Sequence, residues 1–247
     1  MASTATEPVM TETKPTLLGG LEAPLSVKIR RRLSPREHII GLQANKLAKD
    51  VLHTVDLVGL NELKRGARKK VDQVIDLKYF NSEGYMPYSM KRAVRLGLQA
   101  CNNKQILDLG TGFGYFPYVC EFFGHGAMAT DLPGVTLYDE VTEFLGIKKR
   151  HHTVLPFEPL PQFPTRFDMV TGFLVAFNRP NTDDEWGAKE WAFFIEDVFD
   201  NQLKDGGMLA LELNVIDRFN SWYSPDTLAL FRKYGTVDGD RVTLTRR

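Results

Sequence analysis

The stretch ILDLGTGFGYF, residues 106–116, decides the fold of this chain. An apolar run that contains one carboxylate, Asp108, leads into three glycines at every second position, Gly110, Gly112 and Gly114. An apolar run followed by a glycine-rich turn is typical of a strand that passes into a helix and exposes bare backbone to a ligand. In an open α/β sheet, that ligand lies beyond the carboxyl end of the strand. The stretch therefore predicts a ligand site at one strand of a parallel sheet.

The spacing of these glycines separates two classes of ligand. Turns that bind dinucleotides follow G-x-G-x-x-G and place a pyrophosphate on the helix N-terminus, whereas here the third glycine comes one residue early. Asp108 precedes the first glycine by two residues, and its charge would repel a pyrophosphate. The same carboxylate suits a ligand that carries an ammonium group, so the turn favours a cationic ligand over a dinucleotide.

Outward from this stretch, β-type runs alternate with helical stretches. The runs are QILDLG (105–110), GAMATD (126–131), HHTVL (151–155), FDMVTGF (167–173) and GGMLALELN (206–214), and helices are predicted near 115–123, 135–145 and 188–203. Such alternation predicts an α/β protein with a doubly wound, mostly parallel Rossmann-like sheet covered by helices on both faces. Ser224 and Pro225 begin a further helix that reaches about Tyr234, and the segment 236–247 predicts a closing hairpin with an antiparallel strand at the end of the sheet.

The first hundred residues have a different pattern. Residues 1–24 are rich in Thr, Pro, Glu and Ala and predict a disordered tail. Ser34, Pro35 and Glu37 supply an N-cap, a first-turn proline and a capping-box carboxylate for a helix of five or six turns. Further helices are expected at 64–80 and 89–100, with a break over NSEGYMPYS (81–89). The predicted organisation is a tail (1–24), a helical N-terminal subdomain or lid (25–100) and a ligand-binding domain (101–247).

Composition excludes several classes of protein. The 247 residues are 43% hydrophobic and 25% charged, as in ordinary globular proteins. Apolar runs fall short of the roughly 18 residues that span a bilayer, and the sequence predicts no secretory leader. The two cysteines, Cys101 and Cys120, belong to no cluster with metal-ligand spacing, so neither a disulfide framework nor a metal site is expected. A cytoplasmic location is the simplest expectation.

The net charge is zero but unevenly distributed. Residues 1–100 hold 17 Lys and Arg against 10 Asp and Glu, a net charge of +7, and residues 101–247 carry the compensating −7. One interpretation is a basic segment packed against an acidic domain. The alternative is a basic face for nucleic acid or anionic lipid.

Four motifs, in order, resemble the class I S-adenosylmethionine-dependent methyltransferase family. LDLGTGFGY looks like the first motif of that family, and ATDLPG looks like the second, with the acidic Asp131 ending the next strand. The stretch 156–173, with Phe167 and Asp168, is similar to the approach to the fourth strand, and QLKDGGMLALELN is similar to the helix, Gly-Gly turn and fifth strand. The resemblance covers about residues 90–235 and implies a methyltransferase that uses S-adenosyl-L-methionine.

The resemblance also implies which residues hold this donor. Asp108 would neutralise the methionine ammonium, and Asp131 would accept hydrogen bonds from the ribose, with Leu132 against the adenine. The backbone wall would be formed by Gly110, Thr111, Gly112, Phe113 and Gly114. At the end of the third strand the chain departs from the family pattern, so Glu158 and a main-chain group both remain candidates for the adenine amino group.

The sequence does not identify the methyl acceptor, but it offers candidate residues for the acceptor side of the site. Asn178, in AFNRP after the fourth strand, is the candidate catalytic residue, with a turn-forming role as the alternative. His151 and His152 are expected at the start of their strand, away from the ligand. Trp186 is a candidate for the pocket rim. Tyr85 and Tyr88 lie where similar enzymes carry a lid, and packing against the sheet is equally compatible with their position.

Three hypotheses about function follow. The first is methyl transfer to a small-molecule acceptor, at oxygen, because no nucleic-acid module is recognisable and the net charge is zero. The second is methyl transfer to nucleic acid or protein through the basic N-terminal half. The third is a noncatalytic module that binds S-adenosylmethionine. The sequence leaves the oligomeric state open.

Overall fold

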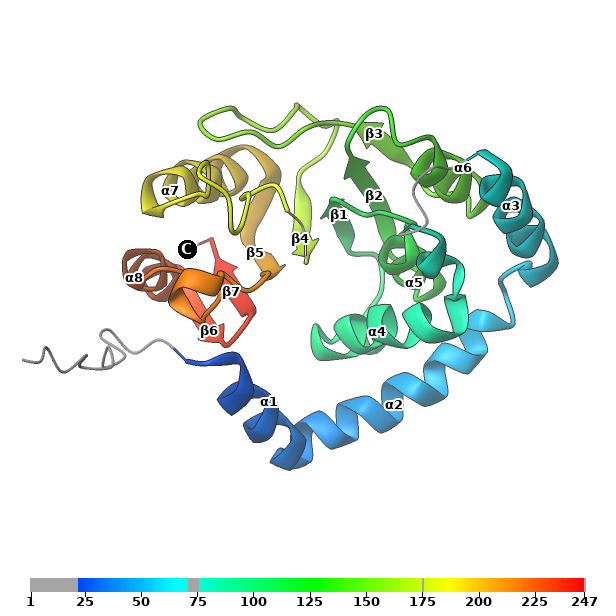
Figure 1. Ribbon diagram of the computed structural model, residues 1–247, viewed down its shortest axis with the longest axis horizontal. Coiled ribbons are helices and arrows are strands. Elements are labelled where there is room, and N and C mark those ends of the chain that lie inside the picture. Colours follow the sequence, from blue (N-terminus) through cyan, green and yellow to red (C-terminus); the bar gives the residue numbers. More distant parts are fainter. Residues whose placement is uncertain (1–21, 71–75, 175, 247) are drawn as a thin grey trace, which may run out of the picture.

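The computed structural model describes residues 22–70, 76–174 and 176–246. Its centre is a seven-stranded sheet in the order β3-β2-β1-β4-β5-β7-β6 (Figure 1). The strands are β1 (Gln105–Leu109), β2 (Gly126–Asp131), β3 (Lys149–His151), β4 (Phe167–Phe173), β5 (Leu203–Glu212), β6 (Gly235–Asp238) and β7 (Arg241–Thr245). The first five run parallel, and β7 pairs antiparallel with both β5 and β6. This confirms the predicted doubly wound sheet and its closing hairpin.

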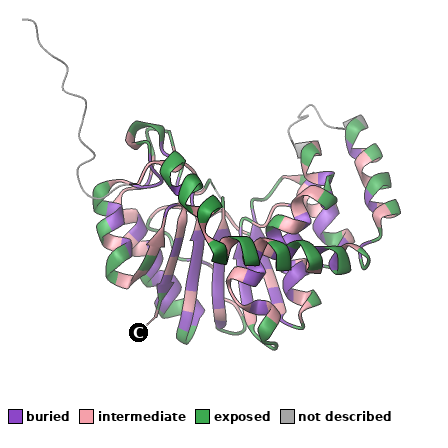
Figure 2. Cartoon of the chain, turned by 90° about the horizontal axis from the view of Figure 1, so that it is seen from below, coloured by how far each residue is buried: buried purple, intermediate pink, exposed green. Residues whose placement is uncertain are grey.

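Side chains that alternate along the strands separate two hydrophobic clusters, one on each face of the sheet. In β1, Ile106 belongs to one cluster, whereas Leu107 and Leu109 belong to the other. The first cluster is covered by α5 (Tyr115–Phe122) and α6 (Thr136–Phe144), and the second by α7 (Ala188–Asp197) and α8 (Pro225–Tyr234). Figure 2 shows the strands buried between these layers. The order reverses at β1, which has β2 on one side and β4 on the other, and a ligand site is expected at this point.

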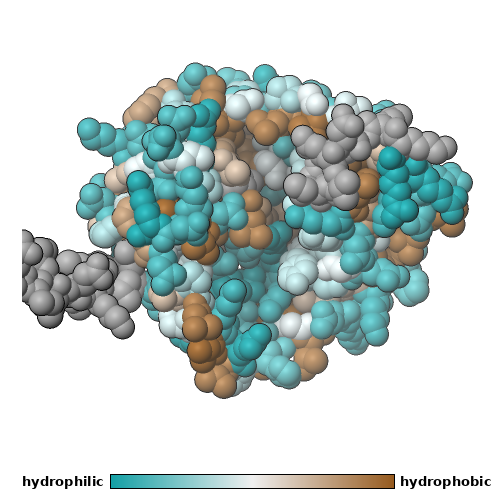
Figure 3. Space-filling view, in the orientation of Figure 1, coloured by the Kyte–Doolittle hydropathy of each residue, from teal (hydrophilic) through white to brown (hydrophobic). Residues whose placement is uncertain are grey.

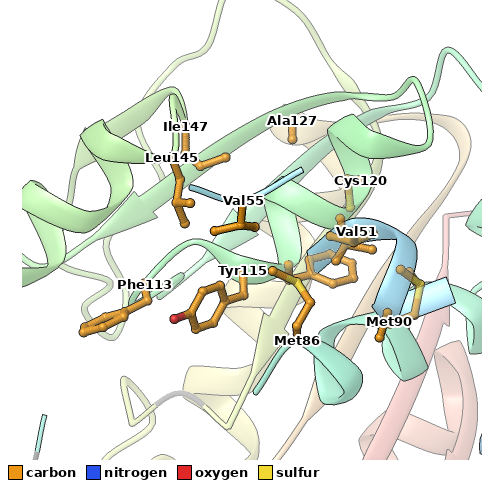
Figure 4. Close-up of a cluster of buried hydrophobic side chains, with 14 of the residues drawn as sticks. Val51, Val55, Met86, Met90, Phe113, Tyr115, Cys120, Ala127, Leu145 and Ile147 are labelled. Atoms are coloured by element: carbon orange, nitrogen blue, oxygen red, sulfur yellow. The ribbon is translucent and has the colours of Figure 1, made fainter. Parts of the chain in front are cut away.

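Three N-terminal helices are part of the first cluster: α2 (Pro35–Leu52), α3 (Leu57–Lys70) and α4 (Ser82–Arg95). The helix that precedes them, α1 (Pro24–Leu33), joins the second cluster through Val27. Val51 of α2 and Met86 and Met90 of α4 pack with Cys120 of α5 (Figure 4). The predicted helix after Ser34 is confirmed, because the Ser34 hydroxyl accepts a hydrogen bond from the Glu37 N–H as an N-cap. The helical region thus shares its core with the sheet.

Several predicted boundaries are wrong. The break over residues 81–89 is instead most of α4, because Asn81 caps the helix through the Gly84 N–H at 3.2 Å and Met86 and Met90 are fully buried. Pro87 is tolerated inside this helix, although it removes one backbone hydrogen bond. The sequence predicts a helix over 188–203. In the structure, the α-helix α7 ends at Asp197, and a π-helical turn follows over Val198–Gln202. In the predicted helix over 64–80, α3 ends at Lys70 and a 3₁₀ turn covers Asp76–Phe80, with 71–75 outside the described residues.

Ion pairs join the basic N-terminal helices to acidic residues of the last strands. Arg31 of α1 bonds to Asp238 and Asp240 at the β6–β7 turn, and Arg92 and Arg95 of α4 contact Glu212 at the end of β5. Part of the charge asymmetry is therefore neutralised inside the fold, as expected for a basic segment packed against an acidic domain. In the portion of the chain that the structure describes, no helix is both long and apolar enough to cross a membrane.

Candidate ligand-binding site

A cavity of about 770 Å³ opens at the carboxyl ends of β1, β2 and β4. Its wall combines the glycine turn after β1, the residues that follow β2 and β4, and one side of α4. The lining residues are Tyr79, Tyr85, Tyr88, Ser89, Arg92, Asp108, Gly110, Thr111, Gly112, Phe113, Tyr115, Phe116, Asp131, Leu132, Tyr138, His152, Thr153, Val154, Leu155, Phe173, Leu174, Ala176, Phe177 and Arg179. The cavity thus lies at the switch point that the strand order indicates.

The glycine turn is fixed to the neighbouring strand through its backbone. The N–H groups of Gly110 and Thr111 donate to the Thr130 carbonyl at 2.9 and 3.1 Å. Gly112 has φ +57°, and a Cβ atom there would meet nothing within 4 Å, so bare backbone faces open space. Gly114 differs, because it does not line the cavity and a Cβ would lie 3.1 Å from Thr142 and 3.2 Å from Ile147. Its lack of a side chain therefore permits the close packing of α5.

Asp108 is a buried carboxylate in the cavity wall. Asp108 is 4% exposed, and the Thr171 hydroxyl donates a hydrogen bond to its Oδ1 at 2.6 Å. Burial raises the pKa of Asp108 to about 6, although the Thr171 hydrogen bond and the nearby Arg92 guanidinium act in the opposite direction. A carboxylate in this position is poorly compensated by the protein alone, so it favours a cationic group in the cavity.

Asp131 ends β2 and faces the same turn. Its Oδ2 accepts the Gly112 N–H at 2.5 Å, and its Oδ1 accepts the Leu132 N–H at 2.8 Å. Burial raises the pKa of Asp131, against these two backbone hydrogen bonds. An ionised carboxylate has about four acceptor positions, so two remain for hydroxyl groups of a ligand. Leu132 lines the cavity beside it and is 50% exposed, which offers an apolar surface to a planar group.

Arg92 lines the cavity from α4, although no motif in the sequence indicated this residue. Its Nε donates to Glu212 Oε2 at 2.8 Å, and its guanidinium lies 4.5 Å from the centroid of the Phe173 ring. Glu212 also contacts Arg95, which in turn pairs with Glu37 of α2. These contacts fix the position of a positive charge near Asp108.

Aromatic side chains form much of the remaining wall. Phe113 is buried, with ring centroids 5.7 Å from Tyr79 and 5.8 Å from Tyr138. Tyr85 lies 5.0 Å from Tyr79, and Tyr88, which is exposed, lies 6.4 Å from Tyr85. Tyr85 and Tyr88, the two tyrosines of the predicted lid segment, both line the cavity.

Two other expectations for this region are wrong. Because β3 spans Lys149–His151 rather than beginning at His151, His152 follows the strand and lines the cavity. Burial lowers the pKa of His152. Trp186 is not at the rim, since it is 3% exposed and packs against Phe177 and Trp191 in the second cluster.

The structure brings together most, but not all, of the predicted site residues. The cavity is lined by Asp108, Gly110, Thr111, Gly112, Phe113, Asp131 and Leu132. Asn178 is 1% exposed and does not line it, although its neighbours Phe177 and Arg179 do. Near the end of β3 the lining comes from residues 153–155 rather than from Glu158. Among the described residues, no group of three or more His, Cys, Asp and Glu is placed to hold a metal ion.

Comparison with known proteins gave matches among solved structures. No family model matches the sequence, and no curated protein matches it. A TehB-like SAM-dependent methyltransferase from Corynebacterium glutamicum is 14% identical, with a TM-score of 0.45 over 77% of this chain and 98% of that one. A SAM-bound amino pentose methyltransferase from Micromonospora echinaspora is 19% identical, with a TM-score of 0.42 over 57% of this chain and 56% of that one.

A Galdieria sulphuraria protein assigned as a sarcosine dimethylglycine methyltransferase is also similar. It is 15% identical, with a TM-score of 0.38 over 55% of this chain and 47% of that one. The chain thus spans about half the length of this protein and of the Micromonospora enzyme. Identities below 25% and TM-scores below 0.5 transfer no substrate or activity to this chain.

Proposed function

We propose that this chain is an S-adenosylmethionine-dependent methyltransferase that acts on a small molecule. The observation that carries this proposal is Asp108, a buried carboxylate beside a glycine turn in a 770 Å³ cavity. A dinucleotide would bring a pyrophosphate to this carboxylate, whereas S-adenosylmethionine brings an ammonium group. The glycine turn and Asp131 fit the rest of such a donor.

Each part of the site has a separate task. Asp108 would hold the ammonium of the donor, and the free acceptor positions of Asp131 would take the ribose hydroxyls. Gly110 and Gly112 would let the ligand approach the backbone. When bound, the donor supplies a methyl group already activated by its sulfonium. The protein then has to align the acceptor and exclude water, which is the task of the aromatic wall.

Calorimetry with S-adenosylmethionine and its demethylated product tests this proposal. Both are expected to bind one site per chain, and NAD and ATP are expected to bind at least 100-fold more weakly, because Asp108 repels their phosphates. Binding of NAD with no binding of either adenosyl compound would contradict the assignment.

Donor binding is expected to weaken in acid. Because burial raises the pKa of Asp108 to about 6, the carboxylate is ionised at pH 7.5 and mostly protonated at pH 5 in the free protein. Protonation removes the charge that holds the ammonium, so the dissociation constant of the demethylated product is expected to be about tenfold higher at pH 5 than at pH 7.5. Calorimetry at both values measures this ratio. A ratio near one would show that Asp108 does not contact the donor's charge.

The acceptor half of the cavity favours an aromatic molecule with an anionic group. Eight aromatic side chains line the cavity besides Phe113, namely Tyr79, Tyr85, Tyr88, Tyr115, Phe116, Tyr138, Phe173 and Phe177. Among the residues that the structure describes, the lining includes two guanidinium groups, from Arg92 and Arg179, and no carboxylate other than Asp108 and Asp131. Among these residues, a cationic amine would lack a partner outside the donor site. This arrangement supports transfer to oxygen on an aromatic acid rather than to an amine.

Backbone strain supports the same assignment for the segment after β4. Leu174 and Arg179 both have positive φ, at +53° and +47°, although neither is glycine. Such conformations cost energy and concentrate where a ligand is held. Among the described residues, Arg179 forms an ion pair only with the exposed Asp184, at 2.6 Å, so its charge remains available at the cavity mouth.

A substitution at Arg179 tests the acceptor. With 4-hydroxycinnamate as the probe, Arg179→Gln is expected to raise KM about tenfold, because one charge-assisted contact is lost, while the affinity for the donor stays unchanged. Arg179→Lys should recover part of the loss. Release of the demethylated donor gives the rate. The matched control is Arg218→Gln, an exposed arginine outside the cavity. Faster turnover of tyramine than of 4-hydroxycinnamate would contradict an acidic acceptor.

A further inference from the structure

The outer face of α1 and α2 exposes an unusual number of apolar side chains. Leu25, Ile29 and Leu33 are 69%, 51% and 77% exposed, and they recur at four-residue spacing along α1. Ile39 and Leu42 of α2 continue the exposed apolar surface at 63% and 60%. Figure 3 shows hydrophobic side chains gathered over α1 at the lower edge of the molecule. We call these five residues the apolar face.

The opposite side of α1 is attached to the protein. Val27 is 1% exposed and belongs to the second cluster, and Arg31 pairs with Asp238 and Asp240. The orientation of α1 is therefore set by its buried side. The apolar face is directed outward as a consequence, and Figure 2 shows α2 continuing this exposed surface across the molecule.

Exposed cations accompany the apolar face. Lys28, Arg32, Arg36, Lys46 and Lys49 are all exposed and, within the described residues, form no ion pair. Arg32 lies three residues after Ile29 on α1 and therefore beside it, and Arg36 lies in the first turn of α2, three residues before Ile39 on the same helix. The surface thus combines unpaired positive charge with apolar side chains.

Three occupants of this surface can be compared on charge. A second copy related by a two-fold axis would bring the same cations together, which costs energy. Nucleic acid would pair with the cations but would leave the leucine and isoleucine side chains in water. An anionic bilayer satisfies both, since the phosphates and carboxylates of its headgroups meet the cations and its acyl boundary receives the apolar side chains.

We propose that α1 and the exposed side of α2 form a docking surface for an anionic lipid membrane. The helices lie in the plane of the interface and do not cross it. Binding requires both components: the five cations set the preference for anionic headgroups, and Leu25, Ile29 and Leu33 enter the boundary of the acyl chains. The surface is separate from the lining of the cavity, so the proposal does not depend on the reaction that the cavity performs.

Vesicle sedimentation with the full chain tests the proposal. The probes are vesicles of 30% phosphatidylserine in phosphatidylcholine and vesicles of phosphatidylcholine alone, at 0.15 M salt. Each Lys or Arg near an anionic surface contributes about fivefold to partitioning, so at least a 100-fold preference for the anionic vesicles is expected. Raising the salt to 0.5 M should reduce this preference, because the Debye length shortens.

Two sets of variants separate the contributions. Leu25→Gln, Ile29→Gln and Leu33→Gln together are expected to weaken binding at least tenfold, and Arg32→Gln with Arg36→Gln to weaken it about 20-fold on anionic vesicles only. All five positions are exposed, so folding should be retained and circular dichroism checks it. Val58→Gln on α3, which is 71% exposed, is the control and should bind as wild type.

Other outcomes would overturn the proposal. Equal binding to both vesicle types, or binding to neither, would exclude an anionic membrane. Sedimentation velocity that shows a dimer, dissociated by the triple leucine and isoleucine variant, would assign the surface to a second copy. Binding to duplex RNA that the triple variant retains in full would assign the cations to nucleic acid.

Discussion

Asp108→Asn is expected to weaken binding of S-adenosylmethionine and of its demethylated product about 100-fold. The amide keeps the shape of the side chain and its contact with Thr171, but it removes the charge that faces the donor's ammonium. Loss of one partner from a desolvated charge pair costs about 2 to 5 kcal/mol, and 100-fold corresponds to about 2.7 kcal/mol. Calorimetry at pH 7.5 measures the effect. The pH dependence of donor binding should disappear in the same variant.

The same substitution is expected to stabilise the protein without ligand. Burial raises the pKa of Asp108 from 3.8 to about 6, so the unfolded chain ionises first as the pH rises between these values. The free energy of unfolding of wild type therefore falls over this interval, by about 3 kcal/mol on account of this group. Asp108→Asn removes this decrease, which urea unfolding at pH 4 and pH 7 would show.

Asp168→Asn is the matched control for Asp108→Asn. Asp168 lies at the amino end of β4, whereas the cavity lies at the carboxyl end of this strand, and it pairs with Lys104 and Lys204. Asp168→Asn should therefore leave donor affinity unchanged. If Asp108→Asn bound the donor as tightly as wild type, the ammonium would have to lie elsewhere and the proposed function would lose its central observation.

Glu37→Gln is expected to lower the free energy of unfolding by about 3 kcal/mol at pH 7. Glu37 is largely buried between α2, α4 and β7, where it pairs with Arg95 at 3.1 Å and Arg241 at 2.7 Å. Removing its charge leaves two partly buried guanidinium groups less compensated, which typically costs 3 to 5 kcal/mol. For a domain of this size the midpoint of thermal unfolding should fall by about 6 to 12 °C, measured by calorimetry.

The effect should depend on pH in a defined direction. Although burial raises the pKa of Glu37, hydrogen bonds from Arg241 and Arg95 outweigh it and lower the pKa from 4.5 to about 2. The stabilisation is therefore complete above pH 4.5 and is lost as the pH falls towards 2. Wild type and Glu37→Gln should converge in acid. Glu62→Gln, at an exposed position of α3, should change stability by less than about 0.5 kcal/mol, and an equal loss there would argue against a specific network.

The parts of the fold that depend on local patterns could be predicted from the sequence. The run 167–173 became β4 with the same boundaries, and the glycine turn lies at the switch point of the sheet. These features follow from alternation and from the backbone needs of glycine, both of which are visible in a few residues.

The parts that depend on distant contacts could not be predicted. Pro87 indicated a break, yet burial of Met86 and Met90 against α2 and α5 favoured a helix there. Arg92 lines the cavity while its guanidinium pairs with Glu212, which is 120 residues away in the sequence. The position of His152 in the cavity wall depends on the register of β3 against β2, in which His151 pairs with Asp131. These contacts join residues that are far apart in the sequence, so no short stretch of it indicates them.

The position of β7 has a consequence for synthesis of the chain. This strand lies between β5 and β6, and its Arg241 is the partner of Glu37 near the beginning of α2. A ribosome must therefore synthesise the chain through Thr245 before α2 can make this contact with the sheet. During translation, Glu37 can already pair with Arg95 of α4, but its second partner, Arg241, becomes available only after β7 has entered the sheet.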